Sequence, residues 1–301
     1  MSRLSTDRLK LRGHRLRLQA DRLYVSVEPE TVAVCRVQGV FKNKLVKKDL
    51  LACDPSYGSA PWDGAVEALK KHLEPLKAER LNVTVVLSNR LVRYALVPFD
   101  AALSGPEEEL ALARFHFTRI YGERAKAWDL RISEGAAGGP RIASGVDEGL
   151  VKALRACFPS TGRARLVSVQ PYLMAAFNRW RSGWQSGSLL ARGGASDKDG
   201  AWLVLLERER ACFALASRAG WQSVQSLRLE NTQDVFELLE RESLRSGSKI
   251  VKRATIHGRA TIQGAKPGDA PDWQLSPLGL ARLEGYSPLD DGRYAMALCA
   301  R

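Results

Sequence analysis

The residue types that most often perform chemistry occur in this sequence without a catalytic spacing. No two of the four histidines are spaced to share one helix face, so a metal site is not expected. These histidines are His14, His72, His116 and His257. Ser88 and Ser168 lack the flanking glycines of a hydrolase nucleophile turn. Because the motifs G-x-x-x-x-G-K-[ST] and G-x-G-x-x-G are also absent, the sequence predicts neither a P-loop nor a dinucleotide-binding loop.

The cysteines predict reduced thiols rather than a disulfide framework. The chain has five of them, an odd number, and they are widely spaced with no C-x-x-C pair. They are Cys35, Cys53, Cys157, Cys212 and Cys299. We therefore expect a protein of a reducing compartment, which is the cytosol in most cells.

The charge of the chain favours an anionic partner. The 301 residues include 46 Lys or Arg and 33 Asp or Glu, for a formal net charge of +13. Residues 1–22 form a basic arm in which cations alternate with leucines, a pattern typical of a β-ribbon with one apolar and one cationic face. The alternating cations are Arg8, Lys10, Arg12, Arg15 and Arg17. We predict that they bind an anionic surface; the alternatives are a frayed tail and a solvated edge strand.

The hydrophobic pattern predicts two similar series of strands and helices that must position these residues. Each series begins with three strands and continues with a helix and a further strand. The first series comprises strands over 23–27, 31–35, 45–51 and 83–87, and a helix with Asp63 as its N-cap. The second comprises strands over 201–206, 211–216, 221–229 and 249–256, and a helix over 232–244. The repeated order predicts an internally duplicated α/β protein.

A smaller α/β unit is predicted between the two series. Its first helix is expected to bury Leu110, Ala113, Phe117 and Ile120, which share one helical face. Short strands are expected over 128–132 and 141–144, and Asp147 is expected to cap a second helix. The Gly- and Ser-rich stretch 186–200 predicts a linker or long loop.

Three segments, together with this order of elements, resemble a known group of proteins. They are 85–98, read as strand, polar turn, strand and proline; 165–171, read as a returning strand; and the closing helix 294–301. The chain resembles the actin-like ATPase superfamily, and within it the PilM-like type IV pilus assembly proteins and the cytoplasmic domains of type II secretion L proteins. The match runs from about residue 23 to the end.

The resemblance implies an α/β, actin-like fold with two ribonuclease-H-like lobes and a small α/β insert. It also implies a division of the chain into five parts. These are the basic arm 1–22, a first lobe of 23–98 and 162–182, an inserted subdomain 99–161, a linker 183–196 and a second lobe 197–301.

The loops that would bind nucleotide in this superfamily are degenerate here. Ser26 stands where the first phosphate loop has Asp, and Glu28 stands where it has Gly. Glu207 and Glu209 lie where the second loop has Asp-x-Gly, and the adenosine loop retains only Gly258. Carboxylates facing a polyanion repel it, by roughly 1–4 kcal/mol per charge pair at about 4 Å. We therefore expect no ATP hydrolysis, no nucleotide cofactor and no catalytic residue.

The expected function is that of a non-catalytic scaffold in a type IV pilus or type II secretion assembly platform. The resemblance implies a cytoplasmic protein, peripheral at the inner membrane, whose partner is a membrane-anchored assembly protein or the secretion ATPase. A divergent ATPase or sugar-kinase-like enzyme is the first alternative. A basic nucleic-acid-binding protein is the second; it depends on charge alone, and we do not expect nucleic acid as a partner.

Overall fold

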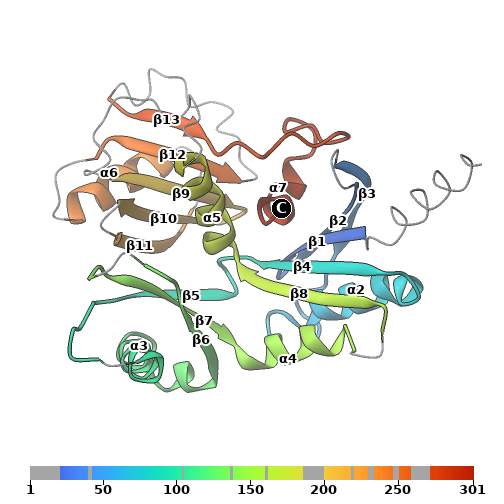
Figure 1. Ribbon diagram of the computed structural model, residues 1–301, viewed down its shortest axis with the longest axis horizontal. Helices are drawn as coiled ribbons and strands as arrows, with labels where there is room; N and C mark the ends of the chain where they lie inside the picture. Colours follow the sequence, from blue (N-terminus) through green and yellow to red (C-terminus); the bar gives the residue numbers. More distant parts are fainter. Residues whose placement is uncertain are drawn as a thin grey trace, which may run out of the picture.

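The computed structural model describes residues 21–39, 43–103, 105–135, 138–159, 162–185, 200–217, 220–229, 234–246, 251–258 and 272–301. These residues form three β-sheets against which helices pack (Figure 1). None of the described helices is both long and apolar enough to span a bilayer.

The first sheet contains five strands in the order β3-β2-β1-β4-β8. Their bounds are β1 (Asp21–Glu28), β2 (Thr31–Gln38), β3 (Lys44–Ala52), β4 (Leu81–Leu87) and β8 (Ala164–Pro171). The first three strands form an antiparallel meander, whereas β1, β4 and β8 are mutually parallel. Helix α2 (Asp63–Leu73) and the short η1 (Glu74–Leu76) lead from β3 to β4. Residues 23–28 of β1 are all buried, as expected for a central strand covered on both faces.

The second sheet repeats the first in strand order and direction. It runs β11-β10-β9-β12-β13, with an antiparallel meander followed by two parallel strands. Its elements are β9 (Ala201–Glu207), β10 (Arg210–Ser217), β11 (Gly220–Arg228), α6 (Asp234–Arg245), β12 (Arg253–Gly258) and β13 (Gln274–Pro277). The predicted duplication is therefore confirmed, and both expected hairpins are present. The sequence had indicated no strand at β13.

The insert is a three-stranded antiparallel sheet in the order β5-β7-β6. Its elements are β5 (Val92–Val97), α3 (Pro106–Tyr121), η2 (Gly122–Ala127), β6 (Trp128–Ile132) and β7 (Arg141–Asp147). Strand β5 pairs with β7, so the insert sheet begins inside the range 23–98 that was expected for the first lobe. Helix α4 (Glu148–Ala156) follows β7, and its apolar side chains join the core of the first lobe.

Three local expectations have different outcomes. Asp147 does cap α4, because its side chain accepts a hydrogen bond from the Gly149 N–H at 2.7 Å. Asp63 is not the N-cap of α2: it lies inside the helix, and its carboxylate accepts the N–H groups of Ser59 and Ala60 at 2.8 and 2.9 Å. Ile120 is 58% exposed rather than buried, whereas Ala113 and Phe117 of the same helix are buried as expected.

The two lobes share one apolar core through helix α5 (Tyr172–Gln185), which passes from the first lobe toward the second sheet (Figure 1). The largest cluster of buried side chains joins residues of β1 and β4 to α5 and to residues of β9 and β10. The short η4 (Gly292–Tyr294) and α7 (Ala295–Cys299) return the end of the chain to the first sheet, where Ala297 and Leu298 pack with Tyr24 and Val37. The last helix thus lies against the first lobe, although 197–301 was expected to form the second.

Candidate functional site

The two hairpin turns expected to replace the phosphate loops meet between the lobes. Glu28 ends β1 and Glu207 ends β9, and both side chains line one small cavity. Glu207 is 4% exposed, and its Oε1 accepts a hydrogen bond from the Asn89 N–H at 3.0 Å. Its Oε2 is hydrogen-bonded to the Ser88 hydroxyl. A carboxylate of the second lobe thus occupies the point where β4 of the first lobe ends.

The cavity between these turns is very small. Its volume is about 10 Å³, and Tyr172, Leu206 and Gly258 complete its walls. Sites that bind small molecules have volumes of roughly 300–1,000 Å³. Among the described residues, the cavity lined by Glu28 and Glu207 therefore has room for about one water molecule.

The other predicted cleft residues are accounted for by packing. Ser26 is fully buried within β1, and Glu209 is exposed at the β9–β10 turn, where its carbonyl accepts the Leu229 N–H at 2.9 Å. Gly258 ends β12 with φ +132°, and a Cβ there would lie 2.0 Å from the Leu206 carbonyl oxygen. Close approach of two strands thus requires glycine at 258.

Burial is the main influence on the ionisation of Glu207. It raises the pKa of this carboxyl from 4.5 to about 7, and the nearby charge of Glu28 acts in the same direction. The hydrogen bonds from Ser88 and Asn89 act in the opposite direction without cancelling the effect. Glu30 behaves differently, because Arg90 binds it through both guanidinium nitrogens, at 2.5 and 2.7 Å, and lowers its pKa despite partial burial.

Two further polar contacts join α5 to the second sheet. The Tyr172 hydroxyl lies 2.6 Å from His257 Nδ1, and the Trp180 indole N–H donates to Thr255 Oγ1 at 3.1 Å. Burial and the nearby charge of Arg179 lower the pKa of His257 to about 4, so this imidazole is neutral at physiological pH. All four residues of these contacts are buried, so the contacts tie α5 to the second sheet inside the protein.

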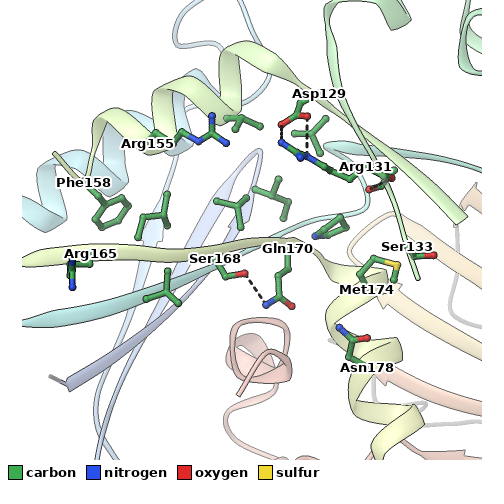
Figure 2. A pocket seen from close by; sticks show the side chains of 18 of the residues that line it. Asp129, Arg131, Ser133, Arg155, Phe158, Arg165, Ser168, Gln170, Met174 and Asn178 are labelled. Atoms are coloured by element: carbon green, nitrogen blue, oxygen red, sulfur yellow. Dashed lines mark hydrogen bonds and ion pairs between the residues drawn. The ribbon is translucent and has the colours of Figure 1, made fainter. Parts of the chain in front are cut away.

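A much larger opening lies between the first lobe and the insert. This groove has a volume of about 770 Å³ and lies among β8, β6, α4 and α5 (Figure 2). β8 is an edge strand of the first sheet and β6 is an edge strand of the insert sheet. Edge strands present backbone N–H and C=O groups to any chain that lies beside them. The groove therefore has a hydrogen-bonding strand edge on each side.

A bulge in β8 directs an apolar side chain outward at the groove. Leu166 is paired with Val83 and Ser168 with Thr84, so Val167 is the additional residue between two ladder partners. Val167 is 63% exposed and lines the groove. Bulges of this kind often redirect a side chain beside a binding site.

Two of the groove's cations have no ion-pair partner within the described part of the chain. Arg131 is paired with Asp129 at 3.2 Å, as the dashed lines in Figure 2 show. In contrast, the guanidinium groups of Arg155 on α4 and Arg165 on β8 form no ion pair with another described residue. The apolar part of the lining includes Phe158 and Met174. This combination of free cations, apolar side chains and strand edges suits an extended peptide that carries carboxylates.

Sequence reasoning did not predict this groove. Its walls come from the first lobe and from the insert, so no single stretch of sequence contains it. The one sequence feature that could have indicated it is Val167, an apolar residue two positions after the charged Arg165 in a strand, both of which are exposed. The predicted anionic-surface residues Arg8, Lys10, Arg12, Arg15 and Arg17 lie outside the described residues, and their role stays a prediction.

Comparison of the whole chain with known proteins finds solved structures with a similar fold. No protein-family model matches the chain, and no curated protein matches it in sequence. A Bacteroides thetaiotaomicron protein, described as having an actin-like ATPase fold and unknown function, is 10% identical with a TM-score of 0.57. That match covers 87% of this chain and 91% of the other. The chain has the actin-like fold.

Two solved structures from assembly systems are similar over nearly their whole length. A structure of the PilM–PilN type IV pilus biogenesis complex matches with 14% identity and a TM-score of 0.60, over 94% of this chain and 96% of that chain. The cytoplasmic domain of EpsL, an inner-membrane component of the type II secretion system of Vibrio cholerae, matches with 12% identity and a TM-score of 0.53. That match covers 93% of each chain. The resemblance inferred from sequence and the predicted α/β, actin-like class are thus confirmed.

Proposed function

We propose that this actin-like protein is a non-catalytic component of a type IV pilus or type II secretion assembly platform. In this proposal it binds an extended segment of a membrane-anchored partner protein at the cytoplasmic face of the inner membrane. The similar structures support such a setting, because one contains PilM with PilN and another is the cytoplasmic domain of an inner-membrane component.

The observation that carries the proposal is the contrast between the two openings. The cavity that the described residues leave between the two turns, where an actin-like ATPase would hold phosphate, has a volume of about 10 Å³ and is lined by Glu28 and Glu207. The groove beside β8 has a volume of about 770 Å³. The groove is thus large enough to bind a partner. The small cavity opposes the binding of nucleotide, both because it lacks space and because its two carboxyl groups repel phosphate.

The groove also indicates what kind of segment would bind. An extended chain lying along β8 would form backbone hydrogen bonds with the strand edge and place alternate side chains on Val167 and Phe158. Carboxylates of the same segment would pair with Arg155 and Arg165, which have no described ion-pair partner. The proposed partner segment is therefore extended, partly apolar and acidic.

Calorimetric titration with the cytoplasmic segment of the cell's own PilN-like or secretion assembly protein tests the proposal. Val167→Asp removes the exposed apolar contact and adds a carboxylate that repels the acidic segment, so we expect at least a tenfold weaker Kd, equivalent to about 1.4 kcal/mol. Val46→Asp is the matched control, because Val46 is a 41%-exposed valine on β3, the opposite edge of the same sheet. Equal affinities of the two variants would refute binding at the groove.

A further inference from the structure

The contact between Glu207 and the end of β4 joins residues that are far apart in the chain. Glu207 lies 119 residues after Ser88 and 118 after Asn89, and it belongs to the other lobe. One carboxyl oxygen accepts the Asn89 N–H at 3.0 Å, and the other is bonded to the Ser88 hydroxyl. Both oxygens of a second-lobe carboxyl are therefore engaged by consecutive residues of the first lobe.

The receiving groups are themselves held in place. Ser88 and Asn89 are fully buried. Ser88 Oγ also accepts the Arg90 N–H at 3.0 Å, and Asn89 Oδ1 accepts the Tyr94 hydroxyl at 2.7 Å. Because their positions are fixed by these bonds, Ser88 and Asn89 form a preformed seat for the carboxyl rather than an incidental surface contact.

We propose that the contact of Glu207 with Ser88 and Asn89 is a proton-dependent clasp that holds the two lobes closed. With its proton, the carboxyl donates from Oε2 to Ser88 Oγ and accepts the Asn89 N–H at Oε1. Without its proton, the same oxygens bear a negative charge in a nearly water-free site beside Glu28. The cost of burying that charge exceeds what the hydrogen bonds from Ser88 and Asn89 return, so the closed arrangement is favoured in the first state and disfavoured in the second.

The groups around Glu207 support a switch near neutral pH. Burial and the charge of Glu28 on β1 raise the pKa of Glu207 to about 7. Arg90, after β4, Arg210, opposite Glu207 on β10, and Arg293, which lines the same cavity, are the nearby cations, but Arg90 is already paired with Glu30. The remaining titratable neighbours are Tyr94, Tyr172 and Cys212, whose pKa values burial raises, so they stay neutral across this range.

The clasp is distinct from the groove but continuous with it along the chain. Leu87 lines the groove and directly precedes Ser88, while Pro171 lines the groove and directly precedes Tyr172 at the interlobe cavity. The inference concerns only the closure of the lobes, and it stands whether or not the groove binds an assembly protein.

Distance measurements between spin labels test the clasp directly. Labels at Tyr57→Cys and Leu244→Cys, which replace exposed residues of the first and second lobes, would be introduced after replacing the partly exposed Cys53 and Cys157 by serine. We expect one narrow distance distribution at pH 6 and a broader, longer one at pH 8.5, with the change centred near pH 7. An unchanged distribution across this pH range would overturn the proposal.

Variants of the same turn separate the clasp from other pH effects. Glu207→Gln keeps a donor and an acceptor but cannot ionise, so its distribution should stay narrow at both pH values. Glu209→Gln, at an exposed site two residues away, should behave like the parent protein. A Glu207→Gln variant that still broadens at pH 8.5 would contradict the assignment to Glu207. Glu207→Ala, where it folds, should be broad at both pH values, and a narrow distribution at both would also contradict it.

Discussion

Gly258→Ala is the perturbation whose magnitude follows most directly from the structure. A Cβ at 258 would lie 2.0 Å from the carbonyl oxygen and 2.9 Å from the carbonyl carbon of Leu206, and the backbone there has φ +132°. Holding a non-glycine residue at such a φ costs about 1–3 kcal/mol. Overpacking against backbone adds about 1–3 kcal/mol, because β9 is the central strand of its sheet and does not give way. We therefore expect a loss of about 2–6 kcal/mol in unfolding free energy.

Urea unfolding of the purified chain measures this loss, and Gly279→Ala is the matched control. Gly279 is exposed, has an ordinary backbone conformation, and has nothing within 4 Å of the position that a Cβ would take. The control should change the unfolding free energy by less than about 0.5 kcal/mol. If Gly258→Ala were as stable as Gly279→Ala, the structural explanation of this glycine would be wrong, and a role in approaching a ligand would become the better one.

Three further predictions concern charge and capping. The pKa of Glu207 is about 7 in the folded chain, above its ordinary value of 4.5 in the unfolded chain. Between these two pH values the folded chain therefore binds more protons at this site than the unfolded chain does. Its unfolding free energy should therefore fall as pH rises from 4.5 through 7, by about 3 kcal/mol in total, and urea unfolding of Glu207→Gln should lack this component. Asp147→Ala removes the N-cap of α4 and should cost about 1 kcal/mol in the same assay, whereas a neutral effect would contradict the capping role. Deletion of residues 1–22 should weaken salt-sensitive co-sedimentation with anionic vesicles, since each Lys or Arg near the vesicle surface contributes about 1 kcal/mol to binding. If the truncated chain bound the vesicles equally well, the arm would be better explained as a solvated edge strand.

Local patterns in the sequence were sufficient to predict much of the fold. The alternation and apolar runs of 23–37 and 201–216 predicted both hairpins, because a strand with β-branched residues and a polar turn is a local signal. Asp147 was recognised as a cap for the same reason, since the cap and its N–H donor are two residues apart. The repeated order of elements then indicated the duplication.

Features that depend on tertiary contacts could not be predicted in this way. β13 has only four residues and ends in proline, so its sequence has no strand period; it exists because β12 offers a parallel edge. The partner of Glu207 is more than 100 residues away in the sequence. The sequence of the turn that contains Glu207 therefore indicated a loop that repels anions, but not that this carboxyl is buried in a contact with the other lobe. The groove requires the edges of two sheets to come together, which no single segment specifies.

The most direct test of the central claim is a calorimetric titration of the partner's cytoplasmic segment into this chain, with and without millimolar Mg-ATP. The proposal places binding at the groove and expects no nucleotide to bind at the cavity of about 10 Å³ that Glu28 and Glu207 line. It therefore predicts the same Kd in both titrations and no heat of binding when Mg-ATP alone is added. Micromolar binding of Mg-ATP, or an affinity for the segment that changes with nucleotide, would contradict it.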